Sequence, residues 1–155
     1  AAIPAEHAAA IAHVKIESMS KVEFAGYEVA AYTANLPGMP PELNVGVRIA
    51  DEVGGRVLVD PVGTTTHELG HALDQQFGNK FSNGPVSKLV RADARHLTRE
   101  ERHIARYYLG TKKEMFAEIY SLAHSTSSSG RFGLSRKRAE EVFARSLRAV
   151  KEIKL

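Results

Sequence analysis

Hydrophobic residues alternate with polar or small ones over residues 45–49, and this alternation later gives way to a helical spacing. A second apolar run at residues 56–60 follows the glycine-containing stretch 52–55, a pattern typical of a two-stranded hairpin. From residue 64 to a glycine at position 78, apolar residues recur on one helical face. They are Leu69, Ala72, Leu73 and Phe77.

Further segments show the same helical periodicity, and they are residues 4–16, 86–94, 98–110, 111–124 and 135–154. Residues 21–33 favour extended structure, residues 35–41 contain three prolines and predict a loop, and residues 125–133 predict a flexible loop. We therefore expect a single α+β domain over residues 1–155. It combines a small β-hairpin or sheet with about five helices.

The composition is that of an ordinary globular domain, with 43% hydrophobic and 25% charged residues. Because the chain has no cysteine, thiolate metal sites and thiol nucleophiles are excluded, and any metal must bind nitrogen and oxygen ligands. The net charge of +3, dispersed among acids, favours neither nucleic acid nor a membrane as partner. The start at Ala1 suggests a processed or excised domain from a longer protein.

The most specific pattern is His67-Glu68-Leu69-Gly70-His71. On a helix, His67 and His71 lie one turn apart with Cβ atoms about 5–6 Å from each other, so two imidazoles can bind one zinc ion. Glu68 points elsewhere, where its carboxylate can take a proton from a water molecule. An ordinary alternative is a capping box between Thr65 and Glu68, and zinc binding requires a helix that starts before Thr65.

A catalytic zinc needs a third protein ligand. A histidine six residues after His71 is one common solution, but Phe77 occupies that position and Asp74 replaces the glycine between them. The other solution is a glutamate from a later helix, where Glu114 and Glu118 lie one turn apart. One of them can bind the metal while the other holds a ligand histidine by its second nitrogen. The alternatives are solvated helix charges or, for Glu114, a cap with Thr111.

These motifs resemble the catalytic domain of anthrax lethal factor and the Pro-Pro endopeptidases, which are zinc metallopeptidases of the gluzincin type. The matching stretches are residues 66–74, Tyr107, residues 114–118 and residues 122–126. The resemblance implies a zincin-like domain with one zinc ion per chain, Glu114 as a ligand, and Tyr107 bonded to the substrate carbonyl or oxyanion. It also implies a secreted bacterial effector, toxin or exported protease.

We expect a zinc endopeptidase with His67, His71 and Glu114 as ligands, Glu68 as general base and Glu118 behind a ligand histidine. Tyr108 is the alternative to Tyr107, and either ring can instead belong to the core. A polypeptide substrate is expected to lie extended along the strand at residues 56–60. The remaining histidines lack ligand spacing, and they are His7, His13, His96, His103 and His124.

A competing interpretation is a non-catalytic interaction module that binds an acidic partner through its last helix. That helix is amphipathic and basic, with Arg136, Lys137, Arg138, Arg145 and Arg148. It also carries glutamates, which is typical of a solvated helix face.

Overall fold

The computed structural model describes residues 2–19, 23–24, 27–28, 31–34, 42–46, 48–50, 56–58 and 60–155, and for the strands it gives the backbone. Seven α-helices and one 3₁₀ turn are present in this part of the chain. They are α1 (Ala5–Ala10), α2 (Pro61–Gln76), α3 (Pro85–Asp93), η1 (Ala94–His96), α4 (Arg99–Ile104), α5 (Lys112–His124), α6 (Arg136–Val142) and α7 (Ala144–Lys151).

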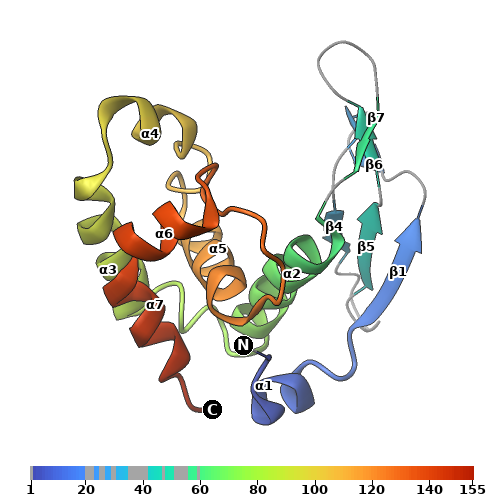
Figure 1. The fold of residues 1–155 in the computed structure, drawn as a ribbon. Helices are drawn as coiled ribbons and strands as arrows, with labels where there is room; N and C mark the ends of the chain where they lie inside the picture. The colour runs from blue at the N-terminus through green and yellow to red at the C-terminus, as the bar shows by residue number, and fades with distance from the viewer. Residues whose placement is uncertain are drawn as a thin grey trace.

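The helices α2 and α5 pack against each other at the centre of the molecule, with α3, α6 and α7 beyond α5 and α4 at one end (Figure 1). Helix α5 is buried from Met115 to His124. A Cβ atom on Gly70 would lie 3.1 Å from Ala117 Cα and 3.2 Å from Tyr120 Cβ. Glycine at position 70 therefore lets the two helices approach closely.

The strands lie in the first part of the chain. Strand β5 (Glu42–Gly46) lies between β1 (Lys15–Met19), to which it is parallel, and β4 (Ala31–Ala34), to which it is antiparallel. Two further antiparallel pairs are β2 (Glu23–Phe24) with β3 (Tyr27–Glu28) and β6 (Arg48–Ala50) with β7 (Arg56–Leu58). Strands β4 and β5 lie beside α2 (Figure 1).

The predicted α+β class is wrong. The strands above all lie within residues 15–58. In residues 2–14, 60 and 62–155, whose side chains the structure describes, 62% of residues are helical, 2% are in strand, and no sheet is present. The hydrophobic core of this part comes from the helices and their connections, so the fold that holds the site is mostly helical. The expected loop at 35–41 and the turn at 52–55 lie outside the described residues.

The last helix was also expected to be continuous over residues 135–154, but two helices replace it. Phe143, with φ −98° and ψ 25°, separates α6 from α7 and is fully buried with its ring stacked on Phe132. The helical spacing of apolar residues continues through Phe143, but the packing of its ring in the core breaks the helix at this position. No helix in the described part of the chain has the length and apolar character needed to cross a membrane.

Candidate metal centre

Helix α2 begins well before the two histidines. Asp60 is its N-cap, and its Oδ1 accepts a hydrogen bond from the Gly63 N–H at 3.0 Å. Thr65 therefore lies inside the helix and does not cap it. The capping-box alternative for Glu68 is wrong, and this carboxylate projects from the second turn of a formed helix.

His67, His71 and Glu114 come together where α2 crosses α5. The Nε2 atoms of His67 and His71 each lie 3.3 Å from an oxygen of the Glu114 carboxylate. One ligand atom from each of the three residues lies within 4.8 Å of the others. Adjacent donors of a tetrahedral ion with bonds of about 2.0–2.1 Å are themselves about 3.3 Å apart. The triad can thus hold a metal ion.

Glu118 lies behind His67, on the opposite side of the ring from Glu114. Its Oε2 accepts a hydrogen bond from His67 Nδ1 at 2.7 Å, and its Oε1 accepts one from the Phe132 N–H at 2.6 Å. The bond at Nδ1 fixes the ring so that Nε2 faces His71 and Glu114. Glu118 is 4% exposed, so these two bonds satisfy a carboxylate that is otherwise buried.

The three groups are strongly coupled electrostatically. Burial lowers the pKa of His67, but hydrogen bonds to the Glu114 and Glu118 carboxylates outweigh it and raise the pKa to about 9. Burial raises the pKa of Glu114, and hydrogen bonds to His67 and His71 outweigh it and lower the pKa to about 2. Because a proton and a metal ion compete for the same ring nitrogen, metal binding displaces the proton from His67.

Thr111 caps α5, as the alternative for Glu114 proposed, but its side chain bonds only the backbone N–H of Glu114 and leaves the carboxylate free of this cap. The Thr111 hydroxyl accepts a hydrogen bond from the Glu114 N–H at 3.1 Å. The Glu114 side chain points away from this cap and toward His67 and His71. The cap thus fixes the first turn of α5, from which the carboxylate reaches the histidines.

The two tyrosines before α5 have different surroundings. Tyr107 is 68% exposed, and the negative charge of Glu114, partial desolvation and the charge of Glu68 raise the pKa of its phenol. Tyr108 is partly buried and packs edge-on against Phe132 with ring centroids 6.3 Å apart. Of the two, Tyr107 is the one whose ring is available to a bound molecule.

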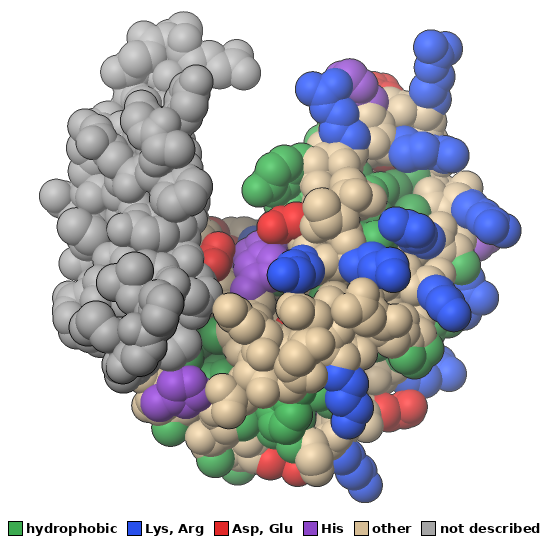
Figure 2. Space-filling model, turned by 180° about the vertical axis from the view of Figure 1, so that it is seen from behind, with side chains coloured by type: hydrophobic (Ala, Val, Ile, Leu, Met, Phe, Trp, Pro, Cys, Tyr) green, Lys and Arg blue, Asp and Glu red, His purple; other side chains and the backbone are tan. Residues whose placement is uncertain are grey.

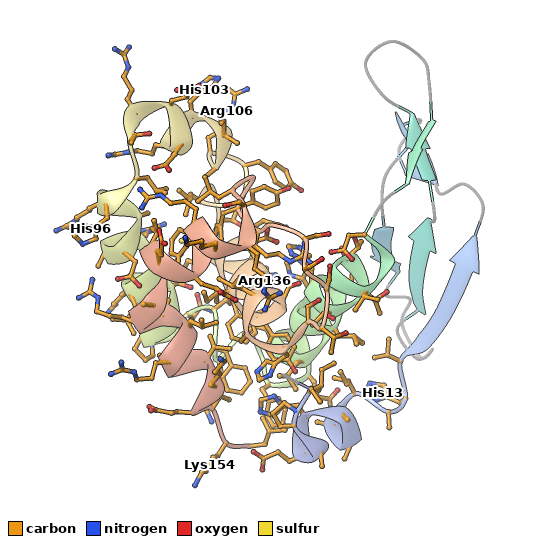
Figure 3. The ribbon with its side chains drawn as sticks, in the orientation of Figure 1. His13, His96, His103, Arg106, Arg136 and Lys154 are labelled. Atoms are coloured by element: carbon orange, nitrogen blue, oxygen red, sulfur yellow. The ribbon has the colours of Figure 1, made fainter. Side chains whose placement is uncertain are left out.

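The other histidines lie away from the triad. His13, His96 and His103 lie on the periphery of the molecule (Figure 3), whereas His7 and His124 are buried between α1 and α5. Among the described residues, His67, His71 and Glu114 form the sole group of three potential ligands. Seen from behind, histidine and acidic side chains lie together near the middle of the molecule, on the surface of the helical part (Figure 2).

Asp74 is not a ligand. It is buried at the end of α2, and its Oδ1 accepts hydrogen bonds from the N–H groups of Phe81 and Ser82 at 2.9 and 3.0 Å. This carboxylate therefore fixes the turn that leads from α2 to α3.

The sequence did not reveal how residues 125–133 support the site. The segment contacts the start of α2, because Asp60 Oδ2 accepts hydrogen bonds from Ser127 Oγ and Arg131 Nη2, both at 2.8 Å. Phe132 is fully buried at φ 58°, a conformation that non-glycine residues rarely adopt, and its N–H holds Glu118. The serines and glycines predict a loop correctly, but its anchoring depends on residues distant in sequence.

Comparison of this chain with protein families, curated proteins and solved structures gives no match.

Proposed function

We propose that the protein is a zinc-dependent endopeptidase. The observation that carries the proposal is the joint geometry of His67, His71 and Glu114, with Glu118 holding His67 from behind. Two imidazoles and one carboxylate, with a second carboxylate on the outer nitrogen of a ligand histidine, are the donor set that catalytic zinc prefers. Such a set leaves one coordination position for a water molecule or a substrate oxygen.

The chain supplies the remaining groups for peptide hydrolysis. Zinc, when bound, polarises the scissile carbonyl and acidifies the attacking water. Glu68 follows His67 on α2, and its carboxylate accepts the proton from that water and transfers it to the leaving nitrogen. The Tyr107 phenol is protonated near neutral pH, and the raised pKa keeps it so, so its hydroxyl donates to the oxyanion that develops on the carbonyl.

A polypeptide substrate is proposed from the resemblance to lethal factor and the Pro-Pro endopeptidases. Residues 66–74 and 114–118 carry that resemblance, and they also supply the triad and Glu118. Residues 56–60, along which the substrate is expected to lie, contain β7, and substrate binding by this strand stays a prediction.

The competing function, an interaction module with a basic last helix, has less support. Three of the five basic side chains hold the fold together: Arg136 donates to Leu122 O and Ser127 O, Arg138 pairs with Glu101, and Arg145 pairs with Asp93. A surface whose cations are already paired within the chain offers little to an acidic partner.

The test is metal content combined with one substitution. We expect about one zinc per chain after reconstitution near neutral pH, and cleavage of some members of a random peptide library, read by mass spectrometry. Glu68→Gln is expected to bind zinc as the wild type does and to lose hydrolysis, because it removes the base and no ligand.

Two controls make the test specific. His71→Ala is expected to lose zinc, whereas His96→Ala, at an exposed position on the periphery, is expected to retain both zinc and activity. The proposal fails if no zinc binds, or if the Glu68→Gln protein hydrolyses peptides at the wild-type rate.

A further inference from the structure

A pocket of about 290 Å³ lies between α3, the 3₁₀ turn η1, α4 and the connection from α4 to α5. Four arginines line it together with Ala94 and Leu109, and most of its exposed wall is apolar. The arginines come from three elements and the turn after α4, and they are Arg91, Arg95, Arg102 and Arg106. Figure 3 shows Arg106 and His103 at the same end of the molecule.

The segment that contains the pocket is basic. Residues 85–110 contain six Lys and Arg against three Asp and Glu, an excess of three that equals the net charge of the entire chain. Lys and Arg side chains gather over the surface that α3 and α4 form (Figure 2). Residues 111–155 are basic as well, with ten Lys and Arg against five Glu, whereas residues 1–84 are acidic, with five against ten.

The acids of this region do not neutralise the pocket. Glu101 accepts two hydrogen bonds from Arg138, and Asp93 accepts them from Arg145 and Ser146. Arg102 donates to the Leu97 carbonyl at 2.9 Å, which orients its guanidinium. Within the described part of the chain, no acid pairs with the other three pocket arginines.

The chemistry of the pocket points to carboxylates carried on a peptide. Guanidinium groups bind carboxylates in paired hydrogen bonds, and the arginines around the rim of one pocket can provide several such pairs. The apolar wall at Ala94 and Leu109 accommodates an aliphatic or aromatic side chain beside those carboxylates. Nucleic-acid sites commonly add aromatic stacking platforms, and none of the residues that line this pocket is aromatic.

One segment of the chain connects the pocket with the metal centre. Arg106 and Leu109, which line the pocket, flank Tyr107 and Tyr108 in the turn that leads into α5, and α5 carries Glu114. The pocket therefore borders the segment that leads to the third potential metal ligand. This continuity favours a polypeptide that occupies both places.

We propose that the arginine pocket docks an acidic segment of the polypeptide substrate, outside the bond that is cleaved. The assignment to the substrate rests on the proposed endopeptidase function, whereas binding of an acidic peptide requires neither zinc nor catalysis.

Peptide binding tests the pocket directly. The probe is a fluorescein-labelled, terminally blocked peptide of glutamates with one leucine and one phenylalanine, compared with its glutamine counterpart by anisotropy in the presence of a chelator. We expect the wild type to bind the glutamate peptide at least tenfold more tightly. Arg95→Glu and Arg106→Glu change exposed side chains, and each is expected to weaken that binding at least tenfold.

Arg148→Glu is the matched control, because it makes the same charge change at an exposed position on α7. It is expected to alter binding less than twofold. The proposal is overturned if the glutamine peptide binds equally well, or if Arg148→Glu weakens binding as much as Arg95→Glu. Tighter, arginine-dependent binding of phosphatidylserine vesicles or of a single-stranded oligonucleotide also overturns it in favour of another partner.

A second measurement separates this proposal from the proposed function. Once a cleaved peptide is known, fusing the acidic segment to it should lower KM without changing kcat, and Arg95→Glu should abolish that gain. Loss of all hydrolysis with retained peptide binding would contradict the endopeptidase function and the assignment to its substrate, but not the docking site. Cleavage with no effect of the acidic segment would contradict the docking proposal alone.

Discussion

The two glutamates of α5 lie one turn apart yet face different nitrogens of the same imidazole. Glu114 lies beside Nε2 of His67, and Glu118 accepts a hydrogen bond from Nδ1. Removing a direct ligand costs more metal affinity than removing the group behind it, whose loss typically costs about 10–100-fold.

We predict that Glu114→Ala abolishes tight zinc binding, while Glu118→Ala leaves a weaker but measurable site. Titration against a competing chelator measures both affinities. Glu140→Ala, an exposed glutamate on α6, is the control and should leave the affinity unchanged. A larger loss for Glu118→Ala would reverse the two roles.

The neighbouring tyrosines give a second prediction at this scale. Tyr107→Phe should lower kcat by at least tenfold with little change in zinc affinity, because its hydroxyl acts where negative charge develops. Tyr108→Phe should change kcat little, because its ring packs on Phe132. Steady-state kinetics of the two variants compares them, and the opposite pattern would assign the role to Tyr108.

Single residues also show the extent to which a sequence predicts a site. The spacing of His67 and His71 is a local property of one helix, so sequence predicts their proximity. The Phe132 N–H that holds Glu118 depends on a loop that returns to α5 with an unusual backbone angle. No pattern of residues along the chain predicts this contact, so the role of Phe132 is found only from the structure.

At the scale of elements, the distance between α2 and α5 sets the geometry of the triad. Gly70 of α2 lies against Ala117 and Tyr120 of α5, where a Cβ atom would come within 3.1–3.2 Å of them. Alanine at this position favours the helix by about 1 kcal/mol, but its Cβ forces α5 outward by a few tenths of an ångström.

We predict that Gly70→Ala weakens zinc binding roughly tenfold, because ligand geometry tolerates only small displacements. Gly70→Val should weaken it further, and the free energy of unfolding of the alanine variant should change by less than about 1 kcal/mol. Chelator competition and urea unfolding measure the two effects. Unchanged zinc affinity in both variants would show that this crossing does not set the site.

The start of α7 illustrates why the last helix was mispredicted. Asp93, in α3, accepts hydrogen bonds from the Ser146 N–H at 3.0 Å and the Ser146 hydroxyl at 2.7 Å. It thus caps a helix that lies more than fifty residues away, directly after the break at Phe143. Residues 135–154 contain no local signal for this cap, so their continuous periodicity predicts one helix.

Asp93→Ala should therefore destabilise the protein by about 2–4 kcal/mol, because it leaves the buried Ser146 N–H without a partner and breaks the pair with Arg145. Urea unfolding measures the loss. Glu140→Ala, which removes an exposed pair with Arg136, should cost less than about 0.5 kcal/mol. Equal costs for the two variants would contradict the capping role.

For the whole molecule, the two ends of the described chain are joined through a buried aromatic cluster. His7 in α1 is fully buried; its Nε2 donates to the Ile153 carbonyl and its Nδ1 accepts from the Tyr120 hydroxyl, both at 3.2 Å. The rings of His7 and Tyr120 lie 5.9 and 4.6 Å from that of His124. The N- and C-terminal segments accordingly lie close together (Figure 1).

This cluster makes stability depend on pH. Burial is the main cause that lowers the pKa of His124 to about 4, against about 6.5 in the unfolded chain. Between these values the unfolded chain binds the extra proton, so the free energy of unfolding falls as the pH falls. The raised pKa of His67 adds stability as the pH falls from about 9 toward 6.5 and so opposes the loss through His124 near pH 7, whereas the lowered pKa of Glu114 affects stability only below about 4.5.

We therefore predict that acidification from pH 7 to pH 5 costs the wild type about 2 kcal/mol through His124. Urea unfolding at both pH values in the presence of a chelator measures this loss without any contribution from bound metal. His124→Phe removes the titrating group and keeps an aromatic ring, so its loss over the same interval should be smaller by that amount, whatever its absolute stability. His96→Phe, at an exposed histidine, should behave as the wild type does, and parallel losses in all three proteins would contradict the role of His124.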